Sequence, residues 1–194
     1  MRKIFILFVF FFLFTSKTWS QTASEFIAAL SVEASDVLSS KLTDEEKIIK
    51  LKKIGESSVD IDGVGLYTLG KYRKILTNTQ KEEYKKLFRN YFLKSFSGRL
   101  VGYSNAKIAV LSEEVKNEKY TIVFSKLIGT SDRPEVKIDW RVYTKDPENP
   151  LIRDLIIEGL SLARTQKEEF NSIIVNNDGN VEALFENLTK FTEN

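Results

Sequence analysis

The side chains that could act chemically are carboxylates, lysines, arginines and hydroxyls, because the 194-residue chain contains no histidine and no cysteine. This absence excludes Ser-His-Asp and Cys-His catalysis, disulfides, and metal sites built from histidine or cysteine. Catalysis by a carboxylate stays open as the less favoured interpretation. It would require a carboxylate with a raised pKa inside an apolar pocket, for which Glu158 is the candidate. We assign no catalytic residue, no metal site and no cofactor.

The clustered charges have simpler explanations than chemistry. Residues 44–46 and 60–62 are acid-rich and lie where helices are expected to begin, so they suit capping and the helix dipole. The second cluster does not continue as a calcium loop, because Val64 and Leu66 stand where oxygen ligands are needed. Lys137, Asp139 and Arg141 alternate on one strand face and could bind an anion, but a solvated sheet face is the preferred interpretation.

The N-terminus has the three regions of a secretory signal peptide. A basic start, Met1-Arg2-Lys3, is followed by an apolar run over residues 4–14 and a polar segment with small residues. We expect cleavage after Ser20, which leaves residues 21–194 as one domain; an uncleaved anchor is the alternative. Removing residues 1–20 lowers the number of Lys and Arg from 29 to 26 against 27 Asp and Glu, so the mature net charge is −1. A strongly basic surface for nucleic acid is therefore not expected.

Helical periodicity dominates the first half of the mature chain. Capping-box patterns begin at Thr22, Thr43 and Thr77, and each is followed by apolar residues at helical spacing. The third helix of this kind has an aromatic stripe and extends to about Leu100. Another helix is expected over residues 66–76, and a last one over residues 181–188.

Strand periodicity begins near Ala106. Residues 120–128, 136–143 and 151–157 form further strands, and the short turns between them favour an antiparallel meander of about four strands. A buried strand, the Glu158-Gly159 interruption and alternating leucines then lead to a capping box at residues 165–168 and a following helix. The order of elements predicts an α+β domain with a twisted antiparallel sheet packed against several helices.

Several short motifs together resemble those of the MlaC family, whose members are periplasmic phospholipid-binding proteins of the Mla system, also called toluene-tolerance proteins. The resemblance covers nearly the whole mature chain in the same order. Its motifs are Leu69-Gly-Lys-Tyr-Arg73, Thr79-Gln80, the helix from Phe88 to Phe96, Asp139-Trp-Arg141, Asp154-Leu-Ile-Ile-Glu-Gly-Leu-Ser-Leu162 and Glu169-Phe-Asn-Ser172.

This resemblance implies a periplasmic lipid shuttle that helps to maintain the lipid asymmetry of the outer membrane. The implied partners are a phospholipid ligand, an inner-membrane Mla ABC transporter complex and an outer-membrane MlaA–porin complex, with no nucleic acid. In the family, acyl chains lie in an apolar cavity between sheet and helices. The expected lining residues here are Leu69, Tyr72, Phe88, Phe92, Phe96, Ile122, Phe124, Ile138, Trp140, Leu160 and Leu162.

The strand members of this set depend on the register of the sheet. A shift of one residue would move every side chain to the other face, so the choice of the inward face is left open. Two other functions also stay open at this point. One is an adaptor whose aromatic groove binds a helix of another protein, and the other is an enzyme acting on a small hydrophobic substrate.

Overall fold

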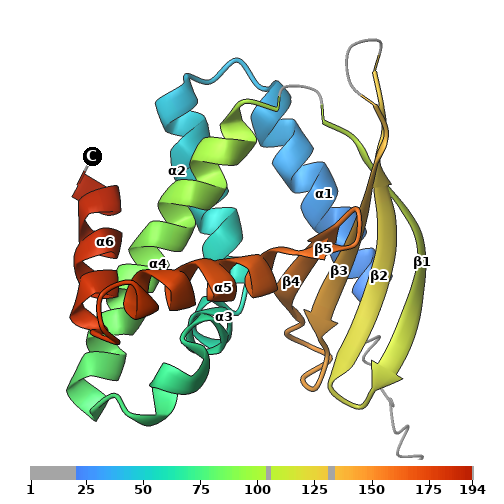
Figure 1. Ribbon diagram of the computed structural model, residues 1–194. Coiled ribbons are helices and arrows are strands. Elements are labelled where there is room, and N and C mark those ends of the chain that lie inside the picture. Colours follow the sequence, from blue (N-terminus) through green and yellow to red (C-terminus); the bar gives the residue numbers. More distant parts are fainter. Residues whose placement is uncertain (1–20, 104–105, 131–133, 194) are drawn as a thin grey trace, which may run out of the picture.

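The computed structural model of the chain describes residues 21–103, 106–130 and 134–193. The expected signal peptide, residues 1–20, lies outside the described residues. The described part contains an antiparallel sheet and a group of helices, as expected for an α+β domain (Figure 1). The helices are α1 (Ala23–Ser39), α2 (Asp44–Ser58), α3 (Ile61–Thr68), the 3-10 helix η1 (Gly70–Lys74), α4 (Asn78–Val101), α5 (Leu162–Val175) and α6 (Glu182–Glu193).

The sheet is a meander in which each strand pairs with the next one along the chain. It has a fifth strand that periodicity did not reveal, because this strand is only two residues long. The strands are β1 (Ile108–Asn117), β2 (Tyr120–Leu127), β3 (Val136–Tyr143), β4 (Leu151–Ile157) and β5 (Leu160–Ser161).

The three capping boxes begin helices where the sequence predicted them. The side chains of Thr22, Thr43 and Thr77 accept hydrogen bonds from the amides three residues later, and the acidic or amide side chain at that later position bonds back. Asp60 caps α3 by accepting from the amide of Gly63. Capping therefore uses one acid of each cluster, Glu46 and Asp60, while Asp62 forms an ion pair with Arg89.

Two helix predictions were wrong in detail. The helix expected over residues 66–76 is divided, because Gly70 has a φ of +56° and begins the separate turn η1. The capping box expected at Thr165 is absent. Helix α5 begins at Leu162 with Ser161 as its N-cap, and the Thr165 hydroxyl donates to the Ser161 carbonyl oxygen.

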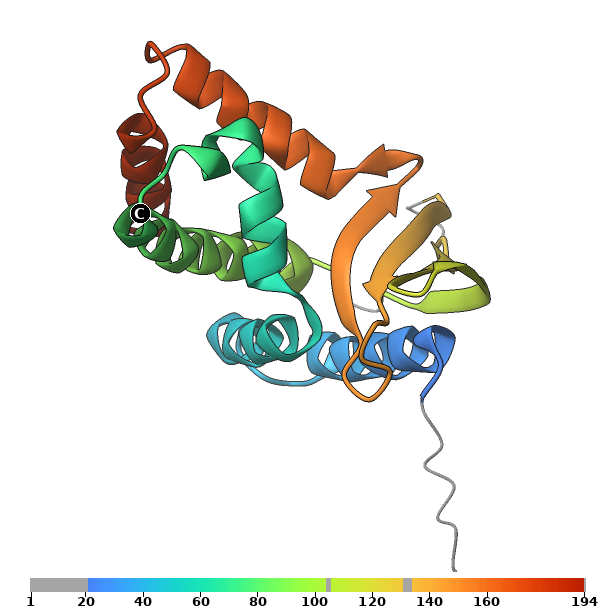
Figure 2. The same ribbon diagram turned by 90° about the horizontal axis from the view of Figure 1, so that it is seen from below.

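One face of the sheet is covered by α1, whereas α3 and α5 contact the edge formed by β4 (Figures 1 and 2). The remaining helices pack beyond that edge, where α4 contacts α2, α3 and α6. The molecule therefore has a helical part and a sheet part, which are joined by α1 and by the start of α5.

The helical part has the larger apolar core, built around the aromatic stripe of α4. Tyr84 and Phe88 are buried there with Phe170 and Leu184. The Tyr84 hydroxyl shares a 2.8 Å hydrogen bond with the Thr68 hydroxyl, and burial raises the pKa of Tyr84 well above its ordinary value. The stripe therefore forms a packed core rather than an open groove along most of its length.

Helices α3 and α4 approach closely because position 65 has no side chain. A Cβ added at Gly65 would lie 2.7 Å from Cδ1 of Phe88, whose ring is buried. By contrast, a Cβ at Gly98 on the exposed side of α4 would meet nothing within 4 Å. The two glycines therefore differ in whether they are needed for packing.

We predict that Gly65→Ala lowers the free energy of unfolding by about 1–3 kcal/mol, because the buried Phe88 ring must shift. The matched variant Gly98→Ala is expected to raise it by up to about 1 kcal/mol through helix propensity. Urea unfolding followed by circular dichroism measures both. Equal stability of the two variants would contradict the packing argument.

Candidate functional site

The pairing of the strands decides which residues share a face of the sheet. Directly opposed residues in an antiparallel pair project to the same side. Trp140 is opposed by Val123 on β2 and Leu155 on β4, and all three join the cluster that includes Ala23 and Ile27 of α1. We call this side the α1 face and the other side the outer face.

Burial decreases across the α1 face. Val123, Trp140 and Val142 are at most 9% exposed beneath α1. Further along the sheet, one cross-strand row is less covered, and its last member, Leu160, is 59% exposed. This row, which we call the Leu160 row, runs through Val110, Ser125, Ile138, Ile157 and Leu160.

Ser125 is the polar member of this row, and its hydroxyl is satisfied. It accepts a 2.8 Å hydrogen bond from the indole nitrogen of Trp140 and donates one of 2.8 Å to the carbonyl oxygen of Ile138. These bonds fix the Trp140 ring beneath the row. The apolar floor is therefore held in one conformation by buried hydrogen bonds.

The eleven residues expected to line a cavity do not surround a single space. Ile138, Trp140 and Leu160 share the α1 face, as expected. Ile122 and Phe124, however, oppose Arg141 and Asp139 on the outer face. Opposed residues share a face, so the sequence set mixed the two faces of the sheet.

The helical members of the set also separate. Leu69, Tyr72 and Phe88 are at most 7% exposed within the helical core. Phe92 and Phe96, one and two turns further along α4, are only partly buried, and their rings stack with centroids 5.6 Å apart. Leu162, also partly buried, is the first residue of α5 rather than part of a strand.

Several residues of similar character were not foreseen. They are apolar, partly buried and packed against the cluster beneath the sheet, and they include Phe26, Leu30, Ile108, Val110 and Leu155. Alternation along β3 gave one face of that strand. Because strand alternation alone does not align neighbouring strands, only the cross-strand register joins the strand residues to the same surface, and the packing of α1 adds Phe26 and Leu30.

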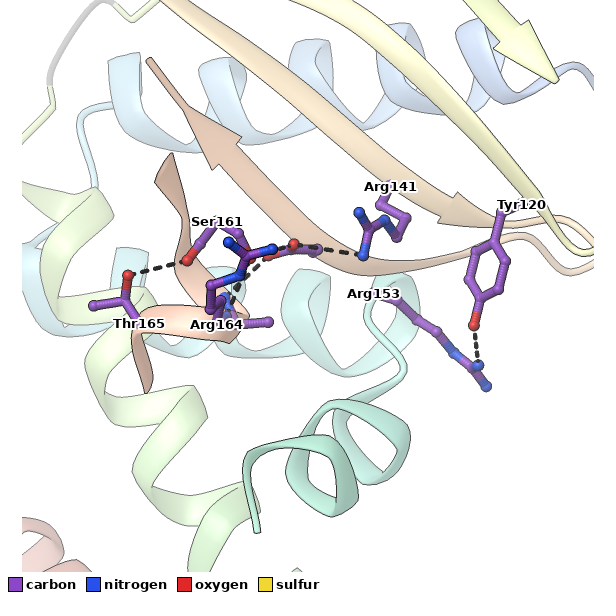
Figure 3. A network of polar contacts seen from close by, with 8 residues as sticks. Tyr120, Arg141, Arg153, Ser161, Arg164 and Thr165 are labelled. Carbon is purple, nitrogen blue, oxygen red and sulfur yellow. Dashed lines mark hydrogen bonds and ion pairs between the residues drawn. The ribbon is translucent and has the colours of Figure 1, made fainter. Parts of the chain in front are cut away.

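The start of α5 is fixed to the sheet by Asp154, whose side chain is 2% exposed. Its carboxylate accepts hydrogen bonds from the Ser161 hydroxyl at 2.6 Å and the Ala163 amide at 3.0 Å, while Arg141 Nη1 lies 4.0 Å away. The Ser161 hydroxyl in turn caps the Arg164 amide, as the contacts in Figure 3 show. Asp154 thus holds both β5, through Ser161, and the start of α5, through Ala163.

Glu158 and Gly159 form the tight turn between β4 and β5, and both have positive φ. Glu158 is exposed, and its carboxylate accepts from the backbone amide of Lys137. The proposed catalytic role required this carboxylate in an enclosed apolar pocket, and the structure places it in an exposed turn instead.

The outer face carries the alternating charged residues of β3, together with Asp154 of β4. Lys137 and Arg141 are exposed, and their cationic groups lie 3.5 Å and 4.0 Å from Asp139 and Asp154. Arg153 donates to the Tyr120 hydroxyl (Figure 3) and lies 4.0 Å from the centroid of the Tyr143 ring. The cations Lys137 and Arg141 are solvated, as the preferred interpretation of the alternating charges expected, whereas the side chains of Asp139 and Asp154 are only 14% and 2% exposed.

Within residues 21–103, 106–130 and 134–193, no group of three or more acidic side chains lies close enough together to hold a metal ion. Nor does any helix in the described ranges combine the length and apolar character needed to span a membrane.

The sequence model of the MlaC protein family matches residues 22–190. This chain belongs to the MlaC family. The match includes α1, the whole sheet and all but the last residues of α6.

The fold also matches a solved structure. It is that of the phospholipid-binding protein from Ralstonia solanacearum, determined in complex with a phospholipid. The TM-score is 0.72 and the sequence identity is 18%, with 90% of this chain and 97% of that chain covered. The arrangement of sheet and helices is therefore shared despite low identity.

We predict that Asp154→Asn lowers the free energy of unfolding by about 1–3 kcal/mol, because the amide cannot accept both buried hydrogen bonds as the carboxylate does. Asp36→Asn, an exposed position on α1, makes the same charge change and is expected to have little effect. Chemical denaturation of both variants measures the difference. A loss no larger than that of the Asp36 variant would show that Asp154 does not anchor α5.

Proposed function

We propose that this protein is a periplasmic carrier that binds a phospholipid and shuttles it between the outer and inner membranes. The observation that carries the proposal is the Leu160 row, which crosses five strands, is apolar except for the buried Ser125, and is not fully covered by α1 at its other four positions. Membership of the MlaC family and the phospholipid in the Ralstonia solanacearum structure support the same ligand class.

The proposed acyl-chain site lies on the α1 face, next to the buried Trp140. Its floor is the Leu160 row, and Phe26, Leu30 and Leu155 extend its apolar surface. We assign the helical wall to Phe92 and Phe96, the partly buried end of the α4 stripe. Ile122 and Phe124 have no place in this site, since they lie on the outer face.

Burial of an acyl chain would bind the lipid tightly and make its release into water slow. Removing an acyl chain from water contributes roughly 0.8 kcal/mol for each methylene group. A chain of ordinary length would therefore hold the lipid strongly enough that spontaneous release into water is slow. Unloading would then require contact with an acceptor, which suits the proposed partners: an inner-membrane Mla ABC transporter complex and an outer-membrane MlaA–porin complex.

A headgroup that stays in water does not require a dedicated ionic partner. Lys137, Asp139, Arg141 and Asp154 lie on the outer face, away from the Leu160 row, and Glu113, the charged residue opposite Val123 on the α1 face, accepts a hydrogen bond from the Ser24 amide of α1. The site can therefore be selective for apolar chains without a buried charge, whose desolvation would be costly. In this proposal, the protein is exported to the periplasm with removal of residues 1–20. There its transport of phospholipid helps to maintain the lipid asymmetry of the outer membrane.

We predict that Leu160→Glu folds normally but loses most of its co-purifying phospholipid. The side chain is exposed, so the fold does not depend on it, whereas a carboxylate at the row would oppose apolar chains. Lipid extracted from protein purified without detergent is quantified by mass spectrometry, and circular dichroism reports the fold.

Leu111→Glu is the matched control, because Leu111 is 60% exposed on β1 and lies outside the Leu160 row. It should retain wild-type lipid content. Full lipid content in the Leu160 variant would remove this residue from the site. Equal losses in both variants would indicate a general effect of added charge.

A further inference from the structure

The turn between α3 and α4 presents a basic and apolar surface on the helical part, at the bottom of Figure 1. Tyr72 and Leu76 are buried and anchor the turn in the helical core. The residues between and beside them are exposed, and Ile75 is 70% exposed. We define the basic corner as Lys71, Arg73, Lys74 and Ile75.

The backbone of η1 holds the side chains of the basic corner on a tight turn at the surface of the helical part. Gly70, with a φ of +56°, ends the path of α3 and begins the tight turn. Thr77 then caps α4 immediately afterwards. The exposed side chains are thus held on a short segment fixed at both ends, and no long flexible loop has to be ordered when a partner binds.

The corner is locally cationic in a chain that is not basic after removal of residues 1–20. The segment from Gly63 to Lys81 contains four Lys or Arg residues and no acidic residue. None of the ion pairs found among the described residues includes Lys71, Arg73 or Lys74. These cations are therefore available to an anionic partner.

The surface next to the basic corner adds a further lysine and an exposed tyrosine. A surface cavity of about 500 Å³ lies between η1 and α5, and Lys71 and Lys167 contribute to its lining. Tyr67, which is 41% exposed, has the Lys167 ammonium 5.3 Å from its ring centroid. Glu168 is the acidic residue in that lining, so the cavity is mixed in charge whereas the corner is cationic.

We propose that the basic corner docks on the surface of a bilayer that contains anionic phospholipids. Three cations complement the negative headgroup layer, and the exposed Ile75 can enter the boundary below it. Tyrosine side chains, such as that of the exposed Tyr67, are also favoured at the interface between membrane and water. An acidic partner would account for the cations alone, whereas a bilayer accounts for the cations and the exposed isoleucine together.

This inference goes beyond lipid binding at the Leu160 row, because docking concerns a separate surface on the helical part. A carrier that also touches the bilayer would remain near the membranes that it serves. The two proposals can fail independently, because vesicle binding and bound lipid are measured separately.

The test is sedimentation of the mature chain with vesicles of equal parts phosphatidylglycerol and phosphatidylethanolamine, against vesicles of phosphatidylcholine. We expect binding to the anionic vesicles that weakens as salt is added. The triple variant K71Q/R73Q/K74Q should lower the partition coefficient by roughly 100-fold, at about a fivefold loss for each cation. Ile75→Ser should lower it by about tenfold.

K41Q/K50Q/K53Q is the control, because it removes three exposed lysines at or near α2 with the same change in net charge. It should bind anionic vesicles like the unchanged protein. Equal binding by the corner variant and this control would overturn the proposal, as would failure of the unchanged protein to bind anionic vesicles. The latter result would favour an acidic protein as the partner of the corner. Lipid content measured in parallel should be unaffected by either triple variant.

Discussion

The structure depends on the way in which α1 covers one face of a five-stranded antiparallel sheet. Where α1 lies against the sheet, Val123, Trp140 and Val142 are sealed from water and form an ordinary core. Beyond it, the same face continues as an apolar row that ends at the exposed Leu160. Exposing apolar side chains to water is unfavourable, and a bound apolar ligand would remove the exposed part of this row from water.

Polar contacts keep that row in place. The bonds from Trp140 to Ser125 and on to the Ile138 carbonyl oxygen fix the floor. Asp154 holds the start of α5 against β4, next to the short strand that carries Leu160. Buried hydrogen bonds that are fully satisfied give rigidity. The apolar surface therefore has rigid supports on the sheet side.

The sequence predicted local elements better than it predicted their alignment. Capping patterns at Thr22, Thr43 and Thr77 correctly gave three helix starts, because these contacts span only three residues. Alternation along β3 was also correct. The pattern at Thr165 was misleading, since Ser161 and the distant Asp154 together set the start of α5. Ile122 and Phe124 were grouped with Ile138 and Trp140, which lie on the opposite face, for a related reason: the face of a β2 residue is set by pairing with β3, and the sequence of β2 does not contain that information.

Native mass spectrometry of residues 21–194, purified without detergent after export to a bacterial periplasm, measures phospholipid binding directly. We expect a population heavier than the bare chain by the mass of one or two phospholipids, with that mass released only when the protein is unfolded or meets acceptor vesicles. A bare mass with no uptake from phospholipid vesicles would contradict it. In that case the family fold would be present without a lipid-binding function, and a groove that binds a protein helix would become the better explanation.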